Sequence, residues 1–118
     1  MTDPIAIDET ERLIASDKVE GTRVYNREGD KLGSVMNFMV NKRSGKAEYA
    51  VLEFGGIFGI GSEHYPIPWE MLDYDQETGG YVVDLDKEKL EGAPSYRDKR
   101  PRWDDIYGQQ VFGYYGLG

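Results

Sequence analysis

The chain has 118 residues, which fits one ordinary domain with a single hydrophobic core and is short for two. Its composition, 39% hydrophobic with 15 glycines and nine tyrosines, favours strands and turns over disorder or an all-helical fold. The formal net charge of -8 opposes direct contact with nucleic acid, and the lack of cysteine excludes disulfides, thiol catalysis and cysteine-ligated metal centres.

The first segment, residues 1–12, is expected to be an extension ahead of the domain. Residues 1–11 carry acidic side chains and no continuous apolar core, so they are expected to form neither a secretory signal nor a membrane-spanning helix. Together with the lack of cysteine, this favours a cytoplasmic location. Contact with a membrane is then expected only through a partner protein.

Alternation of apolar and polar residues, the pattern of a half-buried strand, is concentrated between residues 19 and 85. Residues 23–26 are predicted to form a short strand, and a polar turn that contains Gly29 joins it to a longer strand ending at Val40. After a second turn at residues 41–45, residues 46–54 form the next predicted strand.

Side chains on the predicted strand at residues 46–54 point alternately to its two faces. The face expected to lie in the core carries Ala50, Leu52 and Phe54. The opposite face carries Tyr49, Val51 and Glu53.

A loop with four glycines, residues 55–61, then interrupts the alternation. Residues 63–68 resume it as a short strand whose prolines suit a sheet edge or a strand end. Residues 69–72 are predicted to form one helical turn, residues 75–80 a further turn, and residues 81–85 the final strand.

The predicted strands are followed by a brief helix. Asp86 is a good N-cap for a helix through Leu90, which Gly92 and Pro94 would end. Several short strands joined by tight turns predict a mainly β fold, a small antiparallel β-barrel of about six strands with short helical turns. Residues 13–96 are expected to form this domain, and residues 97–118 an aromatic C-terminal tail.

The order of these residues resembles the PRC-barrel domain family, over residues 13–96. The residues that carry the resemblance are Leu13, Ile14 and Ser16; Gly21, Val24, Tyr25 and Asn26; Gly29, Leu32 and Gly33; Gly45 and Lys46; Tyr49, Ala50, Val51 and Leu52; residues 54–61; Pro66, Ile67, Pro68, Trp69 and Leu72; and Leu90, Ala93 and Pro94. The family includes the cytoplasmic part of the photosynthetic reaction-centre H subunit and the C-terminal half of the ribosome-maturation factor RimM.

The resemblance implies a barrel of about six strands that docks to other macromolecules, with no shared reaction and no catalytic residue to carry over. The transmembrane anchor of the H subunit and the preceding barrel of RimM have no counterpart in these 118 residues. Neither specific role is therefore expected here.

His64 is the only histidine, so a histidine base or zinc site would have to centre on it. Ser62 and Asp73 could complete a triad with it, but proximity in sequence does not set triad geometry. The prediction is a histidine at a strand end that packs or forms a hydrogen bond. No catalytic residue is expected.

The glycine loop lacks the features of a nucleotide-binding loop, because Gly61 and Ser62 are followed by Glu63 and no lysine is present. No cofactor is therefore expected. The loop does carry three apolar side chains, Ile57, Phe58 and Ile60. They either plug the barrel mouth or anchor a partner protein.

A calcium loop is a further candidate in the predicted hairpin. Asp73, Asp75, Glu77 and Asp84 have spacings similar to those of EF-hand ligands. However, the position that needs glycine holds Thr78, and the flanks are predicted strands. A solvated hairpin is expected, with no metal.

The tail combines a predicted helix with several aromatic residues near the end of the chain. Pro101 suits a first turn, and Asp104 and Asp105 suit the positive end of a helix that Gly108 would weaken. Its apolar residues at helical spacing are Trp103, Ile106, Tyr107 and Val111. The tail residues proposed to bind a partner are Trp103, Tyr107, Phe112, Tyr114 and Tyr115.

Two arrangements of the tail remain open. It either packs on its own barrel or reaches a neighbouring subunit or a different protein, with a symmetric homodimer as the commonest form of the second. The predicted function is a non-enzymatic protein-interaction module. The alternatives are an accessory factor that binds a basic ribosomal protein during ribosome assembly and, third, a small-molecule or metal-binding enzyme that uses the glycine loop and His64.

Overall fold

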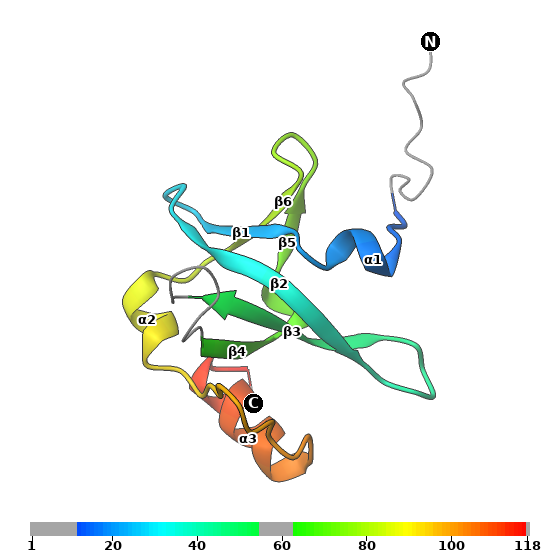
Figure 1. Cartoon of the computed structure of the whole chain (residues 1–118), viewed down its shortest axis with the longest axis vertical. Coiled ribbons are helices and arrows are strands. Elements are labelled where there is room, and N and C mark those ends of the chain that lie inside the picture. The colour runs from blue at the N-terminus through cyan, green and yellow to red at the C-terminus, as the bar shows by residue number, and fades with distance from the viewer. Residues whose placement is uncertain (1–11, 55–62, 118) are drawn as a thin grey trace.

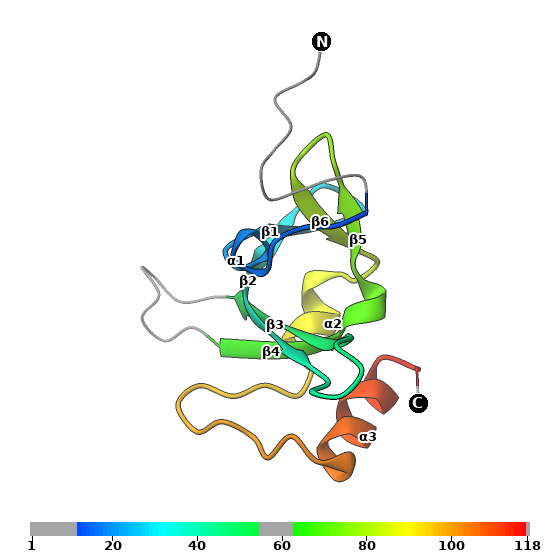
Figure 2. The same cartoon turned by 90° about the vertical axis from the view of Figure 1, so that its right-hand side faces the viewer.

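The computed structural model describes residues 12–54 and 63–117. Six strands form one curled sheet in the order β4-β3-β2-β1-β6-β5 (Figures 1 and 2). The strands are β1 (Arg23–Asn26), β2 (Lys31–Val40), β3 (Ala47–Phe54), β4 (Glu63–Pro68), β5 (Asp73–Asp75) and β6 (Gly80–Val83). The helical elements are α1 (Ser16–Val19), the 3-10 turn η1 (Trp69–Met71), α2 (Lys87–Glu91) and α3 (Asp105–Tyr114).

The mainly β class is confirmed, but the all-antiparallel arrangement is wrong. Strands β1 and β6 run parallel, with Val24 opposite Tyr81 and Asn26 opposite Val83, while the other neighbouring strands are antiparallel. Within the described residues no ladder joins β4 to β5, so the hydrogen bonding does not close the sheet into a complete barrel. The 3-10 turn η1 connects these two edge strands.

The sequence pattern predicted the bounds of most strands correctly. The structure confirms β1 at its predicted bounds, the end of β2 at Val40, and β4 as predicted. The three-residue strand β5 was not predicted, because it is too short to show alternation. Strand β6 ends at Val83, two residues earlier than predicted, although Leu85 is still buried.

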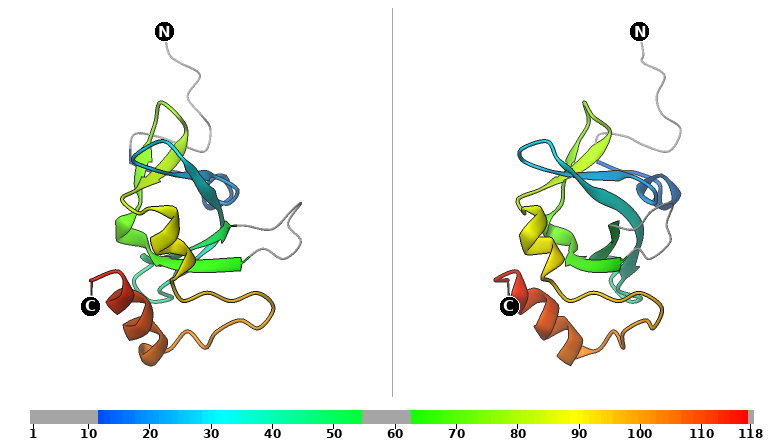
Figure 3. Two further views of the ribbon diagram at one scale, coloured as in Figure 1. Left: turned by 90° about the vertical axis from the view of Figure 1, so that its left-hand side faces the viewer. Right: turned by 60° about the vertical axis from the view of Figure 1, so that its left-hand side comes forward.

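The core is aliphatic and lies inside the curled sheet. Its fully buried side chains include Val24, Leu32, Val35, Leu52, Ile67, Val83 and Leu90. Leu90 comes from α2, whose start is fixed as predicted because the Asp86 carboxylate accepts a hydrogen bond from the Lys89 N–H at 2.7 Å. The left view of Figure 3 shows α2 lying beside the sheet.

Gly33 marks a close approach of β2 and β3. Its φ is +148°, and a Cβ atom there would lie 2.2 Å from the carbonyl oxygen of Glu53. A side chain at this position would therefore force the two strands apart. The pairing of β1 with β2 is irregular one residue further on, between Val24 and Tyr25.

Both faces of β3 are covered. Ala50 and Leu52 are fully buried on the predicted core face. On the opposite face Val51 is fully buried and Tyr49 is only 8% exposed, so a single buried face was an incomplete description of this strand. On that second face Tyr49 contacts Trp103 and Phe112 of the C-terminal tail. None of the helices in the part of the chain described here is long and apolar enough to cross a membrane.

Candidate interaction surface

Residues 95–97, at the junction of the domain and the tail, are clamped to the first residues of β4. The His64 N–H donates to the Tyr96 carbonyl at 2.8 Å, and the Tyr96 N–H donates to the His64 carbonyl at 3.0 Å. Beside this bridge the Ser95 hydroxyl donates to the Glu63 carboxylate at 2.7 Å, and the Arg97 guanidinium donates to its other oxygen. These two hydrogen bonds lower the pKa of the Glu63 carboxyl from its usual value.

Helix α3 then packs against β4 (Figures 1 and 2). It begins at Asp105, because the Asp104 carboxylate caps it by accepting a hydrogen bond from the Tyr107 N–H at 3.0 Å. Pro101 therefore lies in the preceding segment rather than in the first helical turn, contrary to the prediction.

The face of α3 that packs on the sheet differs from the predicted one. Val111 is fully buried, whereas Ile106 is 70% exposed and so does not share its face. Tyr107, four residues before Val111, is partly buried, and burial raises its pKa to about 12. The buried stripe thus follows the helical period through Tyr107 and Val111, with Ile106 on the solvent side.

Tyr49 of β3 is the centre of the tail's aromatic contacts. Its ring centroid lies 5.1 Å from that of Trp103 and 5.5 Å from that of Phe112. Trp103 also contacts Tyr96 and Tyr107 edge to face, at 6.3 and 5.5 Å between centroids. Such tilted and edge-to-face pairs are the favoured aromatic geometries.

The end of the tail returns to α2. The Tyr114 hydroxyl donates to the Lys89 carbonyl at 2.6 Å, and the Lys89 ammonium lies 4.2 Å from the Tyr114 ring centroid. Tyr115 packs against the core beside it, and burial raises the pKa of its hydroxyl. In this structure the five predicted tail residues therefore contact their own chain, and their binding of a partner stays a prediction.

Gly108 has a packing reason to be in the helix. A Cβ atom at this position would lie 3.1 Å from the Tyr49 hydroxyl oxygen. Glycine costs helix stability, as the sequence suggested, but here it allows α3 to approach β3 closely.

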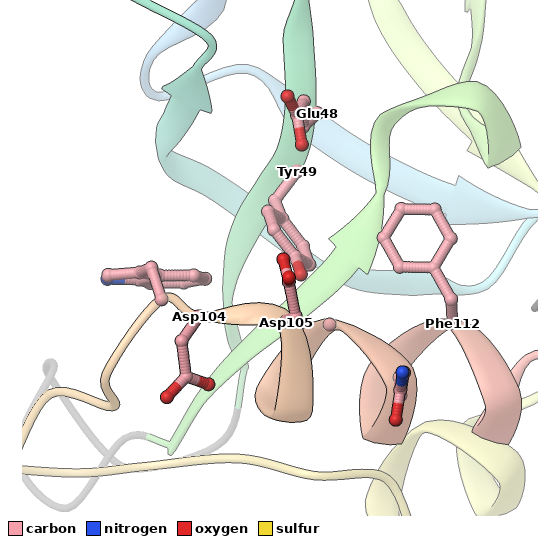
Figure 4. Close-up of a pocket in the computed structure, with 8 residues that line it drawn as sticks. Glu48, Tyr49, Asp104, Asp105 and Phe112 are labelled. Atoms are coloured by element: carbon pink, nitrogen blue, oxygen red, sulfur yellow. The ribbon is translucent and has the colours of Figure 1, made fainter.

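A pocket of about 420 Å³ lies where β3 meets the start of α3 (Figure 4). Its lining residues are Glu48, Tyr49, Trp103, Asp104, Asp105, Gly108, Gln109 and Phe112. Burial raises the pKa of Tyr49, and the nearby negative charges of Glu48, Asp104 and Asp105 raise it further. The pocket therefore combines aromatic walls with acidic groups.

Of the five tail residues named from the sequence, Trp103 and Phe112 line this pocket, whereas its β3 residues were not among the candidates. Glu48 and Tyr49 come from the middle of the chain, and no local pattern links them to residues 103–112. The available signal was the alternation of β3, which places the bulky Tyr49 and Val51 on the face away from the core. Two large apolar side chains there indicate that another segment covers that face.

The triad considered for His64, which the sequence did not favour, gains no contact between His64 and Asp73 in the described residues. Asp73 pairs instead with Arg27, at 3.5 Å between Oδ2 and Nη2, and Ser62 lies outside the described residues. The His64 Nε2 lies 3.5 Å from the Glu53 Oε2, and its ring packs on Tyr96 at 5.2 Å between centroids. These contacts agree with the predicted packing role of His64.

The calcium-loop candidates form the β5–β6 hairpin. Arg27 lies between two of them, with its Nε 4.0 Å from Asp84 Oδ1 in addition to the contact with Asp73. Asp75 accepts hydrogen bonds from the Glu77 N–H and the Thr78 hydroxyl, so it orders the turn. Across residues 12–54 and 63–117, no three acidic or histidine side chains are grouped as metal ligands.

The apolar residues of the glycine loop, Ile57, Phe58 and Ile60, lie outside the described residues. Their two predicted roles, plug and anchor, both stay predictions. The substitution Phe58→Ser separates them, because a plug would lose about 2–4 kcal/mol of stability. An anchor would instead lose partner binding with little change in melting temperature.

Comparison with known proteins identifies the domain. The chain is 27% identical over 77 residues to an uncharacterised protein of Deinococcus radiodurans; the match covers 65% of this chain and 27% of that protein. A crystal structure named as a 16S ribosomal RNA processing protein, RimM, from Pseudomonas aeruginosa is 17% identical, covers 71% of this chain and 50% of that one, and gives a TM-score of 0.43. The chain thus spans about a quarter of the first protein and half of the second. The model of the PRC-barrel domain matches residues 11–90, so this chain belongs to the PRC-barrel domain family.

Proposed function

We propose that this chain is a non-enzymatic protein-interaction module whose docking surface is the junction of α3 with β3. The observation that carries the proposal is the 420 Å³ pocket at that junction, walled by aromatic side chains. Trp103 and Phe112 line it while remaining partly exposed. Partly exposed aromatic residues around a pocket are typical of the residues that dominate protein–protein binding energy.

The pocket is held open by its own packing. Trp103 and Phe112 both rest on Tyr49, which is almost fully buried, so their rings are fixed before a partner arrives. Fixed side chains lose little conformational entropy on binding. The exposed Ile106 adds apolar area on the adjoining solvent side of α3.

We place the tail, residues 97–118, as a separate functional part appended to the domain at residues 13–96, after an extension at residues 1–12. The family match ends at residue 90, which supports treating α3 as an addition to the shared domain. The net charge of -8 supports a protein partner over nucleic acid. The proposal includes a cytoplasmic location, with membranes reached only through a partner.

Site-specific photocrosslinking tests the docking surface. A photoreactive phenylalanine analogue replaces Gln109, at the pocket rim, in the full chain expressed in its own cells, and the matched control carries it at Glu88 on α2. Both residues are exposed. We expect an adduct with one defined protein from position 109 and not from position 88. Equal labelling from both positions, or none from position 109, would contradict the proposal.

The same adducts separate two forms of the function. An adduct between two copies of the chain, with a solution mass that doubles as concentration rises, identifies the homodimer. An adduct with a ribosomal protein, together with co-sedimentation with ribosomal particles, identifies the assembly-factor alternative, which the acidic charge supports because ribosomal proteins of this kind would be basic.

A further inference from the structure

We propose that the pocket between β3 and α3 receives an arginine side chain carried by a basic segment of the partner protein. The inference rests on the proposed function and names the chemistry of the partner at that surface. It follows from three observations: aromatic walls, acidic groups that lack a cation, and a second pocket that has its own cations.

The walls of the pocket suit a cation. Tyr49, Trp103 and Phe112 surround it, and Trp103 and Phe112 remain partly exposed to the space between β3 and α3. The negative faces of aromatic rings attract ammonium and guanidinium groups, Trp most strongly. An apolar ligand would also fit these walls, so the acidic groups decide between the two.

Glu48 on β3 and Asp104 and Asp105 at the start of α3 all line the pocket (Figure 4). Two of them are oriented by hydrogen bonds: Glu48 accepts from the Asn41 amide at 2.9 Å, and Asp104 caps the helix. No ion pair joins any of the three to a basic side chain within the described ranges. Three carboxylates that line one pocket make it complementary in charge to a cation.

The start of α3 also contributes positive charge, because a helix N-terminus carries about half an elementary charge. That partial charge opposes a cation. It is outweighed by the three full negative charges of Glu48, Asp104 and Asp105, so the net field in the pocket still favours a cation.

A second pocket, of about 520 Å³, lies beside α2 and serves as a comparison. It also has acidic lining residues, including Asp84 and Asp86. Lys89 lines it, however, and Arg27 lies 4.0 Å from Asp84. The negative charge of this pocket, to which Glu28 also contributes, is therefore partly balanced from within the chain, whereas no basic side chain lines the α3 pocket.

Arginine fits the pocket better than lysine does. Its planar guanidinium stacks on aromatic rings, donates two parallel hydrogen bonds to one carboxylate and is less strongly hydrated than an ammonium group. Asp105 and Glu48, which line the same pocket as Trp103, offer such carboxylates. A basic segment can therefore place one guanidinium over the rings while its neighbours interact with the acidic surface.

The test uses the full, isotope-labelled chain and two short peptides with blocked ends, Gly-Arg-Gly-Arg-Gly and the same peptide with citrulline in place of arginine. Citrulline keeps the shape and removes the charge. NMR spectra follow the indole N–H signals of the two tryptophans. Trp103 lines the pocket, whereas Trp69 packs inside against Phe38 and Tyr81. We expect the arginine peptide to change the chemical shift of the Trp103 signal in a saturable way and to leave that of Trp69 unchanged.

A charge-matched pair of variants makes the test specific. Glu48→Gln with Asp105→Asn removes two charges from the pocket and should weaken arginine-peptide binding about tenfold. Asp17→Asn with Glu88→Gln removes two charges from the first turns of α1 and α2, and should change binding by less than about twofold. Asp104 is left intact because it caps α3.

Three results would overturn the inference: equal shifts of Trp103 by the citrulline peptide, equal or tighter binding of a lysine peptide, or equal loss in the two double variants. The photocrosslinking experiment tests the docking surface independently of the arginine site. If the photocrosslink from position 109 survives in the variant that lacks the charges of Glu48 and Asp105 while arginine binding is absent, the docking surface stands and the arginine site does not.

Discussion

The two faces of β3 are both buried, but by different means. Ala50 and Leu52 on the inner face are enclosed by their own sheet and by α2, and they are aliphatic. On the outer face Val51 is fully buried, and Tyr49 is buried in contact with the aromatic rings of Trp103 and Phe112 from the tail. Both faces of β3 lie within residues 11–90, which the family model matches, whereas the aromatic residues that contact Tyr49 on the outer face lie beyond residue 90.

The substitution Leu52→Ala should have the largest effect, because it leaves a cavity in the fully enclosed inner face. We expect the free energy of unfolding to fall by about 3 kcal/mol, measured by urea denaturation followed by circular dichroism. Val40→Ala, at the half-exposed end of β2, is the control and should cost less than about 1 kcal/mol. Similar losses in both variants would mean that the inner face is not the stabilising core.

Ending the chain at Tyr96 should cost less, about 2 kcal/mol, because the lost burial of Val111 and of the aromatic pairs is partly offset by the entropy of a tail that need not be ordered. Tyr49, which loses its contacts with Trp103 and Phe112, should then promote self-association, measured by light scattering over a range of concentrations. A shortened chain with unchanged stability and unchanged solution mass would show that the outer face does not need its cover.

The two glycines inside α3 test how closely the tail approaches the sheet. Gly113→Ala meets no atom within 4 Å and should stabilise the protein by up to about 1 kcal/mol through helix propensity. Gly108→Ala should gain less or lose stability, because the new methyl group would lie 3.1 Å from the Tyr49 hydroxyl. Adding Tyr49→Phe should restore the gain at position 108. Equal gains at both glycines would argue against the close approach.

The clamp at the start of the tail should show the smallest effect and a dependence on pH. The pKa of Glu63 is lower in the folded state than in the unfolded state, so its contribution is complete above the usual carboxyl pKa of 4.5 and is lost as the pH falls further. We expect hydrogen exchange at the Tyr96 amide to quicken below that pH. Glu63→Gln should remove the pH dependence and cost less than about 1 kcal/mol, since the site is partly exposed.

Prediction from the sequence succeeded where the determining interactions are local. The alternation in residues 23–26 and 63–68 and the cap at Asp86 each depend on neighbouring residues, and the structure confirms all three. The parallel pairing of β1 with β6 depends on residues far apart in the chain, and no local pattern indicates it. For the same reason the sequence left open whether the tail packs on its own barrel or on another chain, and did not indicate that α3 would meet β3.

The parallel pair also sets an order of folding. Strand β1 lies between β2 and β6 in the sheet, so the first strand of the domain pairs with the last one. Asn26 cannot meet Val83 until most of the chain has been synthesised, and a long loop must close before this contact forms. During synthesis β2, β3 and β4 can pair with one another early. The sheet is completed only after β6 has left the ribosome. Helix α3, which follows β6 in the chain, packs on the sheet after that.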